Sequence, residues 1–292
     1  MTNFYPFSVF NTLINPEMEI SSLTSSLTLP TSGFMKNYLG AEIMKEVIPP
    51  IFWIDGHIEG APIPGNWHAC HLEWASVIHA IRNSKKNPVI IELGCGWGCW
   101  MLNSAYIAMK LNKGIANVIG VDGDSSMLEF GEKTFHHNIK NLNLQNVTYK
   151  FINGLVGSGV GEAGFESQDG DISYGLRPSE TAKKENVVPW VELCSISKFS
   201  EVSLMHIDVQ GYEIDFLHKN LVEINRNIKR LIIGTHSRII EGEVIKLLAA
   251  NGWLLLAERP CVFNLPKESF DLSSTVDYTT IDGLQYWVNQ KI

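Results

Sequence analysis

Residues 88–99 read PVIIELGCGWGC, and this stretch decides the fold. An apolar run ends at Leu93, glycines follow at every second position (Gly94, Gly96 and Gly98), and a segment of helical character begins after them. Glycine permits a tight turn and lets a flat ligand approach the backbone, because no Cβ stands in the way. The stretch therefore predicts a strand, a glycine-rich turn and a helix.

Two residues beside these glycines indicate which ligand the turn binds. The dinucleotide-binding pattern G-x-G-x-x-G requires a further glycine where this chain has Cys99. Glu92 adds a carboxylate close to the backbone amides of the turn. This combination suits a nucleoside that carries an amino acid better than it suits a pyrophosphate. We therefore expect S-adenosylmethionine as the cofactor, bound by Glu92, Gly94, Gly96 and Gly98.

Composition and charge narrow the class of protein. The chain has 292 residues, of which 45% are hydrophobic and 18% are charged, as in an ordinary globular protein with one large α/β domain. Its formal net charge of −8 disfavours nucleic acid and anionic membranes as partners, because phosphate binding needs clustered Lys and Arg. We expect a small-molecule or glycan acceptor as the partner, and a homodimer stays open as the assembly.

The cysteines and the N-terminal residues indicate the cellular compartment of the protein. The five cysteines form no C-x-x-C pair, so neither a zinc site nor a thioredoxin-like motif is indicated, and we expect no metal. The N-terminus lacks a basic start followed by an apolar run, and no stretch approaches the roughly 20 apolar residues of a membrane helix. We therefore expect a cytoplasmic protein without a membrane span.

Two regions differ in their hydrophobic pattern. Residues 1–66 show no sustained period and are expected to form an N-terminal arm and cap, whereas residues 67–292 alternate strand and helix patterns as a Rossmann-like domain does. Such alternation implies parallel strands with right-handed crossovers and a ligand beyond their carboxyl ends. The glycine-rich residues 154–186 are expected to be a loop on the ligand side. The expected strands are 89–93, 117–122, 147–152, 204–209, 231–234, 253–258 and 284–288, and the expected helices are 71–81, 100–111, 125–138, 212–220 and 244–251.

Asp122 and Asp124 lie where the second of these strands ends. An acidic side chain at that point can accept hydrogen bonds from both ribose hydroxyls of a cofactor. We expect Asp122 to bind the ribose, with Asp124 as a second candidate. The alternative for either residue is a cap at the start of the following helix.

Residues 204–213 read LMHIDVQGYE and form the second informative stretch. Because side chains alternate along a strand, His206 and Asp208 point to the same face. A buried histidine and a buried carboxylate both need partners. Asp208 is expected to reach the ligand site from the carboxyl end of the strand. His206 is either a substrate contact or a satisfied core histidine.

Three features together resemble the FkbM-type family of adenosylmethionine-dependent methyltransferases: residues 92–98, Asp122 and residues 207–213. The likeness spans roughly residues 70–260. The resemblance implies a class I methyltransferase fold, which is a Rossmann-like α/β sheet of seven mostly parallel strands, the last antiparallel, with helices on both faces. It also implies O-methylation of a hydroxyl on a sugar, a glycan precursor or a secondary metabolite.

Two departures from the family pattern bear on the substrate. The family usually has Lys-Ile-Asp-Val-Glu-Gly in the second stretch, whereas here His206 stands for the lysine and Gln210 for the glutamate. These changes affect the handling of substrate or proton and leave the cofactor prediction intact. We expect both side chains to contact the substrate.

His236 follows the strand predicted at 231–234 and is expected to face the same cleft. Methyl transfer to an alcohol requires alignment of the acceptor oxygen and removal of a proton, and a neutral histidine suits the second task near pH 7. We expect His236 and Asp208 to be catalytic, with His236 as the general base or as a group that orients the acceptor. A structural histidine on a loop is the alternative, and Mg²⁺ held by these two residues is a weaker one.

Two other functions compete with this interpretation. A nicotinamide-dependent oxidoreductase would want glycine at the position of Cys99. A non-catalytic adenosylmethionine-binding module would keep the fold as a scaffold. Against the second alternative, Glu92, Asp122 and Asp208 all stand where ligand-binding chemistry needs them.

Overall fold

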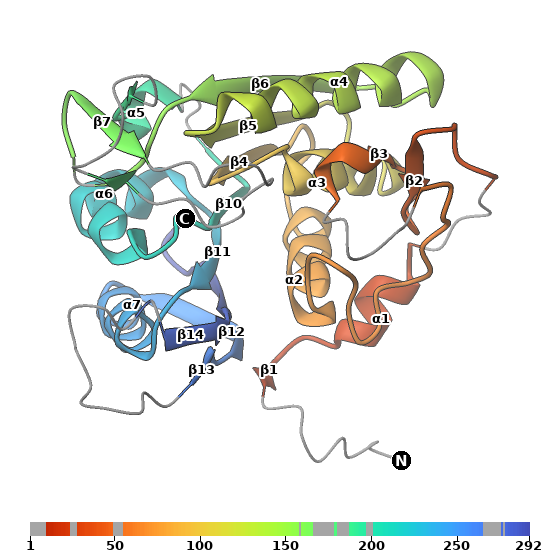
Figure 1. Cartoon of the computed structure of the whole chain (residues 1–292). Helices are drawn as coiled ribbons and strands as arrows, with labels where there is room; N and C mark the ends of the chain where they lie inside the picture. The colour runs from red at the N-terminus through yellow and green to blue at the C-terminus, as the bar shows by residue number, and fades with distance from the viewer. Residues whose placement is uncertain are drawn as a thin grey trace.

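An eight-stranded mixed sheet organises the chain (Figure 1). The computed structural model describes residues 10–23, 28–48, 55–157, 159–165, 178–179, 187–196, 201–264, 276 and 278–292. The sheet runs in spatial order through β6 (Val147–Asn153), β5 (Ala116–Asp122), β4 (Val89–Leu93), β10 (Leu204–Ile207), β11 (Arg230–Thr235), β15 (Gly283–Asn289), β12 (Trp253–Arg259) and β1 (Asn11–Thr12). The strands from β6 to β11 pair in parallel, whereas β15, β12 and β1 each pair antiparallel with the preceding strand in this order.

The Rossmann-like core is confirmed, but the predicted number of strands is wrong. Seven strands between residues 89 and 289 form the expected pattern, in which the last, β15, is antiparallel. The eighth is β1, which the N-terminal arm adds at the edge of the sheet by pairing with residues 257 and 258 of β12. A two-residue strand has no detectable sequence period, and pairing with a distant edge creates it.

Helices cover both faces of the sheet, and the sheet separates the core into two apolar clusters (Figure 1). One apolar cluster packs beneath α2 (His71–Arg82), α3 (Cys99–Lys110) and α4 (Ser125–Asn141). The other packs beneath α5 (Leu193–Ile196), α6 (Glu213–Asn227) and α7 (Arg238–Ala250). Strand β4 shows why: Ile90 belongs to the first cluster and Ile91 to the second, so both faces are buried and the strand is apolar throughout.

The N-terminal region packs against the helical layer beside α2 and α4. The helix α1 (Pro16–Ser21) is joined to α2 by an ion pair between Glu19 and Arg82, 2.9 Å. The backbone of Glu42 hydrogen-bonds the Asn138 side chain of α4. The remaining elements are β2 (Phe34–Lys36), β3 (Glu42–Met44), the 3₁₀ turn η1 (Lys45–Val47), β7 (Glu162–Phe165), β8 (Pro178–Ser179), β9 (Val187–Pro189), β13 (Val262–Phe263) and β14 (Thr279–Ile281).

The other predicted elements are found, with shifted ends in all except β4. Helix α7 begins at Arg238, six residues before the predicted 244, because Ser237 caps it by accepting the N–H of Ile240. The predicted loop at 154–186 lies largely outside the described residues, and its described parts include the paired strands β7 and β8. Within the described ranges, no helix is both long enough and apolar enough to cross a membrane.

Candidate functional site

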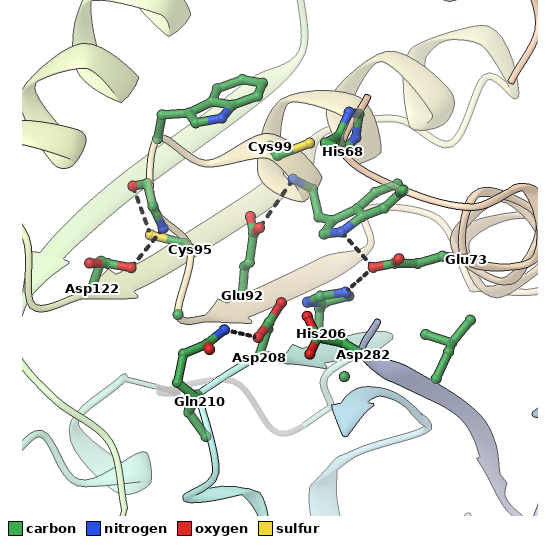
Figure 2. A pocket seen from close by; sticks show the side chains of 18 of the residues that line it. His68, Glu73, Glu92, Cys95, Cys99, Asp122, His206, Asp208, Gln210 and Asp282 are labelled. Atoms are coloured by element: carbon green, nitrogen blue, oxygen red, sulfur yellow. Dashed lines mark hydrogen bonds and ion pairs between the residues drawn. The ribbon is translucent and has the colours of Figure 1, made fainter. Parts of the chain in front are cut away.

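A cavity of about 750 Å³ opens at the carboxyl ends of β4, β5 and β10 (Figure 2). This is where a parallel α/β sheet binds its ligands. Segment 64–70, which precedes α2, and residues 280–284, which lead into β15, complete the wall. Eight of the predicted site residues line the cavity: Glu92, Gly94, Gly96, Asp122, Asp124, His206, Asp208 and Gln210. Gly98 and His236 do not line it.

The glycine turn is a point of close backbone contact. Gly94 has φ +74°, and a Cβ there would overlap the backbone oxygen of Asp208 at the end of β10. Gly98 has φ +80° at the N-cap of α3, and a Cβ would come within 2.8 Å of the Phe151 ring. Gly94 therefore brings the turn against the neighbouring strand, whereas Gly98 serves turn geometry and packing.

Glu92 binds the start of α3. Its side chain is 3% exposed and accepts the N–H of Met101 at 2.8 Å and that of Trp100 at 3.2 Å. Burial raises the pKa of Glu92 to about 8, opposed by the charge of His206 and by the two amides. The carboxyl group therefore fixes the helix that follows the glycine turn while lining the cavity.

Asp122 and Asp124 have separate structural roles. Asp122 accepts the N–H of Gly96 at 2.7 Å and the N–H of Asp124 at 2.8 Å, so its carboxylate ties the glycine turn to the end of β5. Asp124 accepts the N–H of Ser126 at 2.9 Å and caps α4. The helix-cap alternative therefore applies to Asp124, although both side chains line the cavity.

Asp208 and Gln210 lie together at the end of β10. Gln210 adopts φ +53° and donates its side-chain amide to Asp208 Oδ1 at 2.9 Å (Figure 2). Burial alone would raise the pKa of Asp208, but its contact with His236, the charge of His206 and the Gln210 amide together lower it. Asp208 is therefore an ionised carboxylate at the cavity.

His236 lies behind Asp208 and is 2% exposed. Its Nδ1 is 2.8 Å from Glu213 Oε1 and its Nε2 is 3.2 Å from Asp208 Oδ1. Burial opposes the charged form, yet the two carboxylates outweigh it and raise the pKa of His236 to about 11. A raised pKa favours the protonated ring, whereas a general base requires the neutral imidazole, so the predicted role of His236 as general base stays a prediction.

His206 lies on the cavity wall rather than in the apolar core. It is 2% exposed, and its Nε2 is 2.9 Å from Glu73 Oε1, which also accepts the indole N–H of Trp100 at 3.0 Å (Figure 2). Burial lowers the pKa of His206, but Glu73 outweighs it and the net shift is upward. Within the described chain, Nδ1 is buried without a hydrogen-bond partner.

Several residues outside the predicted set of site residues also line the cavity. Trp67 and His68 line it from the segment before α2, where the sequence shows no recognisable binding motif. Burial, with the charge of His206, lowers the pKa of His68 to about 3, so its ring is neutral. Arg259, on β12, and Asp282, just before β15, also line the cavity, without any local sequence signal. Among the described residues, no group of three or more His, Cys, Asp or Glu side chains could hold a metal ion.

Comparison with known sequences gives one informative relative. A protein named "Putative methyltransferase" from Jannaschia sp. (strain CCS1) is 35% identical over 243 residues, which cover 79% of this chain and 85% of that protein. No model of a known protein family matches the sequence.

Two solved methyltransferase structures show a distant likeness to this chain. A precorrin-6y C5,15-methyltransferase from Geobacter metallireducens GS-15 superposes with a TM-score of 0.41 at 7% identity, covering 76% of this chain and 90% of that one. A methyltransferase FkbM from Methylobacillus flagellatus KT superposes with a TM-score of 0.41 at 10% identity, covering 69% of this chain and 43% of that one. At these scores neither likeness carries an argument about substrate.

Proposed function

This chain belongs to the methyltransferases, and on that basis we propose that it methylates a hydroxyl on a sugar, a glycan precursor or a secondary metabolite. Its cofactor is S-adenosylmethionine, which supplies a methyl group on a sulfonium centre that is activated for displacement. The FkbM-like pattern of residues 207–213 supports the choice of a hydroxyl acceptor. The nicotinamide-dependent alternative is not favoured, because the relative is a methyltransferase by name.

The cavity fits this cofactor. Its volume of about 750 Å³ lies within the range of about 300–1,000 Å³ found for small-molecule sites. Gly94 and Gly96 line the cavity together with Asp122 and Asp124, and a Cβ at Gly96 would meet only Met127 Cε, at 3.7 Å, so the turn is open to a ligand at Gly96. We assign cofactor contacts to these two glycines, these two aspartates and Asp208, while Glu92 and Gly98 hold the turn in shape.

The observation that carries the hydroxyl proposal is the polar part of the cavity beyond the glycine turn. His206, Asp208, Gln210 and Asp282 line that part, and Arg259 stands among them. Such groups donate and accept hydrogen bonds of the kind a hydroxylated acceptor needs. We assign the acceptor to His206, Gln210 and Asp208, with His236 acting from behind Asp208.

Calorimetric titration with S-adenosylmethionine and with NAD tests the cofactor, and transfer of a labelled methyl group to a panel of glycosides and hydroxylated metabolites tests the acceptor. We expect binding of S-adenosylmethionine and a product in which the new methyl group is on oxygen. Binding of NAD without binding of S-adenosylmethionine would contradict the proposal. Cofactor binding without transfer to any hydroxyl in the panel would favour a non-catalytic module or another acceptor atom.

The variant Asp122→Ala tests the site itself, because the carboxylate holds the N–H of Gly96. We expect the cofactor Kd to rise at least about tenfold, which is the loss of roughly one charge-assisted hydrogen bond. Glu129→Ala is the matched control, since Glu129 is an exposed carboxylate on α4 that does not line the cavity. Equal losses in the two variants would show that the effect is not specific to Asp122.

A further inference from the structure

Asp208, Glu213 and His236 come from three elements and meet in one contact chain. Asp208 follows β10, Glu213 is the first residue of α6, and His236 follows β11. The His236 ring lies between the two carboxylates, 2.8 Å from Glu213 and 3.2 Å from Asp208. The side chains of Glu213 and His236 are 0% and 3% exposed, so these charges are held away from water. Buried charges persist only where they are paired. Here the imidazole is hydrogen-bonded to Glu213 and forms an ion pair, without hydrogen-bond geometry, with Asp208.

Glu213 also fixes the backbone that carries Asp208. Its Oε1 accepts the N–H of Gly211 at 3.0 Å and that of Val209 at 3.2 Å. Between these two donors the chain turns through Gln210 at φ +53°, a conformation that residues other than glycine seldom adopt. Because one carboxylate binds both the turn and the imidazole ring, the position of Asp208 depends on His236 and Glu213 together.

Of the three contacting residues Asp208, Glu213 and His236, Asp208 is the one that faces the cavity. Its side chain is 38% exposed, against 3% for His236. The contacts from Gln210 and His236 both use Oδ1, and within the described residues no hydrogen bond reaches Oδ2. Oδ2 is therefore the oxygen free to meet a bound acceptor.

We propose that His236 is a positioning residue, a buried imidazolium that holds the Asp208 carboxylate in place, and that Asp208 takes the proton of the acceptor hydroxyl. This inference rests on the proposed O-methylation. In the step, the acceptor O–H bond breaks and its proton goes to Asp208 Oδ2. An electron pair of the acceptor oxygen forms the new bond to the methyl carbon, and the pair of the broken carbon–sulfur bond stays on sulfur.

A carboxylate is an adequate base for this step. The acceptor hydroxyl becomes strongly acidic as its oxygen gains the methyl group, so the proton can pass to a group of low basicity as the bond forms. Alignment of the two reacting atoms is then the main task of the protein. A carboxylate fixed from behind by His236 and from the side by Gln210 meets that demand.

Several charged groups act on Asp208, Glu213 and His236 and set the pH dependence of this group of residues. His236 faces Asp208, Glu213 and, at 3.8 Å, Asp282. The groups that influence the titration of Asp208 are His236, His206 and Gln210, and Asp208 in turn acts on Glu92, Asp122 and Asp282. Removal of the His236 charge leaves mostly carboxylates around Asp208, so burial then raises its pKa.

Protonation of His236 is the first test, and it does not depend on activity. Nitrogen NMR of ¹⁵N-histidine-labelled protein, assigned with the His236→Gln variant, reports both ring nitrogens. We expect both to stay protonated through neutral pH and up to a pKa of about 11, and the pKa to fall in Glu213→Gln. A neutral His236 ring at pH 7 would overturn the proposal, even if the protein methylates a hydroxyl.

The pH profile of kcat is the second test. In the wild type, Asp208 stays ionised below its ordinary pKa, so the acid side of the profile is flat. In His236→Gln we expect the pH at which kcat begins to fall on the acid side to rise by at least about one unit. We also expect kcat itself to be about 100-fold lower. His218→Gln, on the exposed surface of α6, is the matched control and should behave as the wild type does.

The outcomes separate the two proposals. If the wild type transfers no methyl group to a hydroxyl, the proposed function fails, while the NMR result still decides whether His236 is a fixed cation. If the acid limb and kcat of His236→Gln stay within a few-fold of the wild type, the positioning role fails although the function stands. A His218→Gln profile that moves in the same way would also count against the proposal.

Discussion

Asp122 and Asp124 are separated by one glycine, yet the two carboxylates bind different partners. Asp122 holds the amides of Gly96 and Asp124, whereas Asp124 holds the first turn of α4. Their positions at the end of a strand could be predicted from the sequence. Which amides each carboxylate binds could not be predicted, because this depends on which backbone N–H groups the folded chain leaves without a partner.

The cap at Asp124 makes a prediction about stability. In Asp124→Ala the N–H groups of Ser126 and Met127 lose their acceptor, and we expect the free energy of unfolding to fall by about 1 kcal/mol. Urea unfolding followed by circular dichroism measures this change. Asp124→Asn, which keeps an oxygen that can cap the helix, should recover most of the loss. An alanine variant as stable as the wild type would refute the capping role.

The Glu73–His206 pair makes a prediction about pH. Because the folded pKa of His206 lies above its ordinary value, the pair stabilises the fold fully below about pH 6.5, and this stabilisation is lost as the pH rises through the folded pKa. In Glu73→Gln burial should dominate and the pKa of His206 should fall. We expect the stability difference between wild type and variant to be larger at pH 6 than at pH 9, as measured by urea unfolding. A difference independent of pH would contradict this.

At the scale of elements, the apolar strands and helices could be predicted from the sequence, whereas the polar contacts between these elements could not. Strand β4 was predicted with the bounds that the structure has, because a strand buried on both faces is apolar throughout. Both Glu73 and His206 are visible in the sequence, but they are 133 positions apart and no local pattern pairs them. The same holds for Glu213 and His236, which a turn and a helix bring together.

The contact between the glycine turn and β10 makes a prediction at this scale. Gly94→Ala places a Cβ against the backbone of Asp208, so either the glycine turn or the end of β10 must move. Gly33 has a similar φ of +87°, but a Cβ added there would meet nothing within 4 Å, so Gly33→Ala isolates the conformational cost, about 1–2 kcal/mol. We expect Gly94→Ala to lose about 3 kcal/mol or more and to lose cofactor binding, as measured by urea unfolding and calorimetry. Equal costs in the two variants would argue against a close approach.

For the whole molecule, the N-terminal region forms part of both the sheet and the site. Pro64, Gly65 and Asn66 line the cavity, and β1 extends the sheet beyond β12. The sequence predicted an arm and a cap at residues 1–66 but no contribution to the sheet. Edge pairing of this kind leaves no periodic signal, since it needs only two residues whose backbone groups meet those of a partner strand.

The edge strand makes a prediction for the whole chain. The N–H of Leu13 donates to the backbone oxygen of Leu256 at 2.7 Å, and Leu13→Pro removes that donor. We expect β1 to detach, the edge of β12 to open and the protein to self-associate, as measured by sedimentation velocity at increasing concentration. Leu13→Ala keeps the N–H and changes a side chain that is 74% exposed, so it should sediment as the wild type does. Identical behaviour of the two variants would contradict the role of the edge.

The same pairing has a consequence for the order of folding during synthesis. Strand β15 lies between β11 and β12, and it comes from residues 283–289 at the end of the chain. The partner of β1, which is strand β12, ends at Arg259, so residues 11–12 leave the ribosome long before their pairing surface exists. At a synthesis rate of about 5–20 residues per second, the N-terminal arm waits on the order of ten seconds or more for the strand that it covers. Residues 11–12 are therefore among the last of the sheet to find their place.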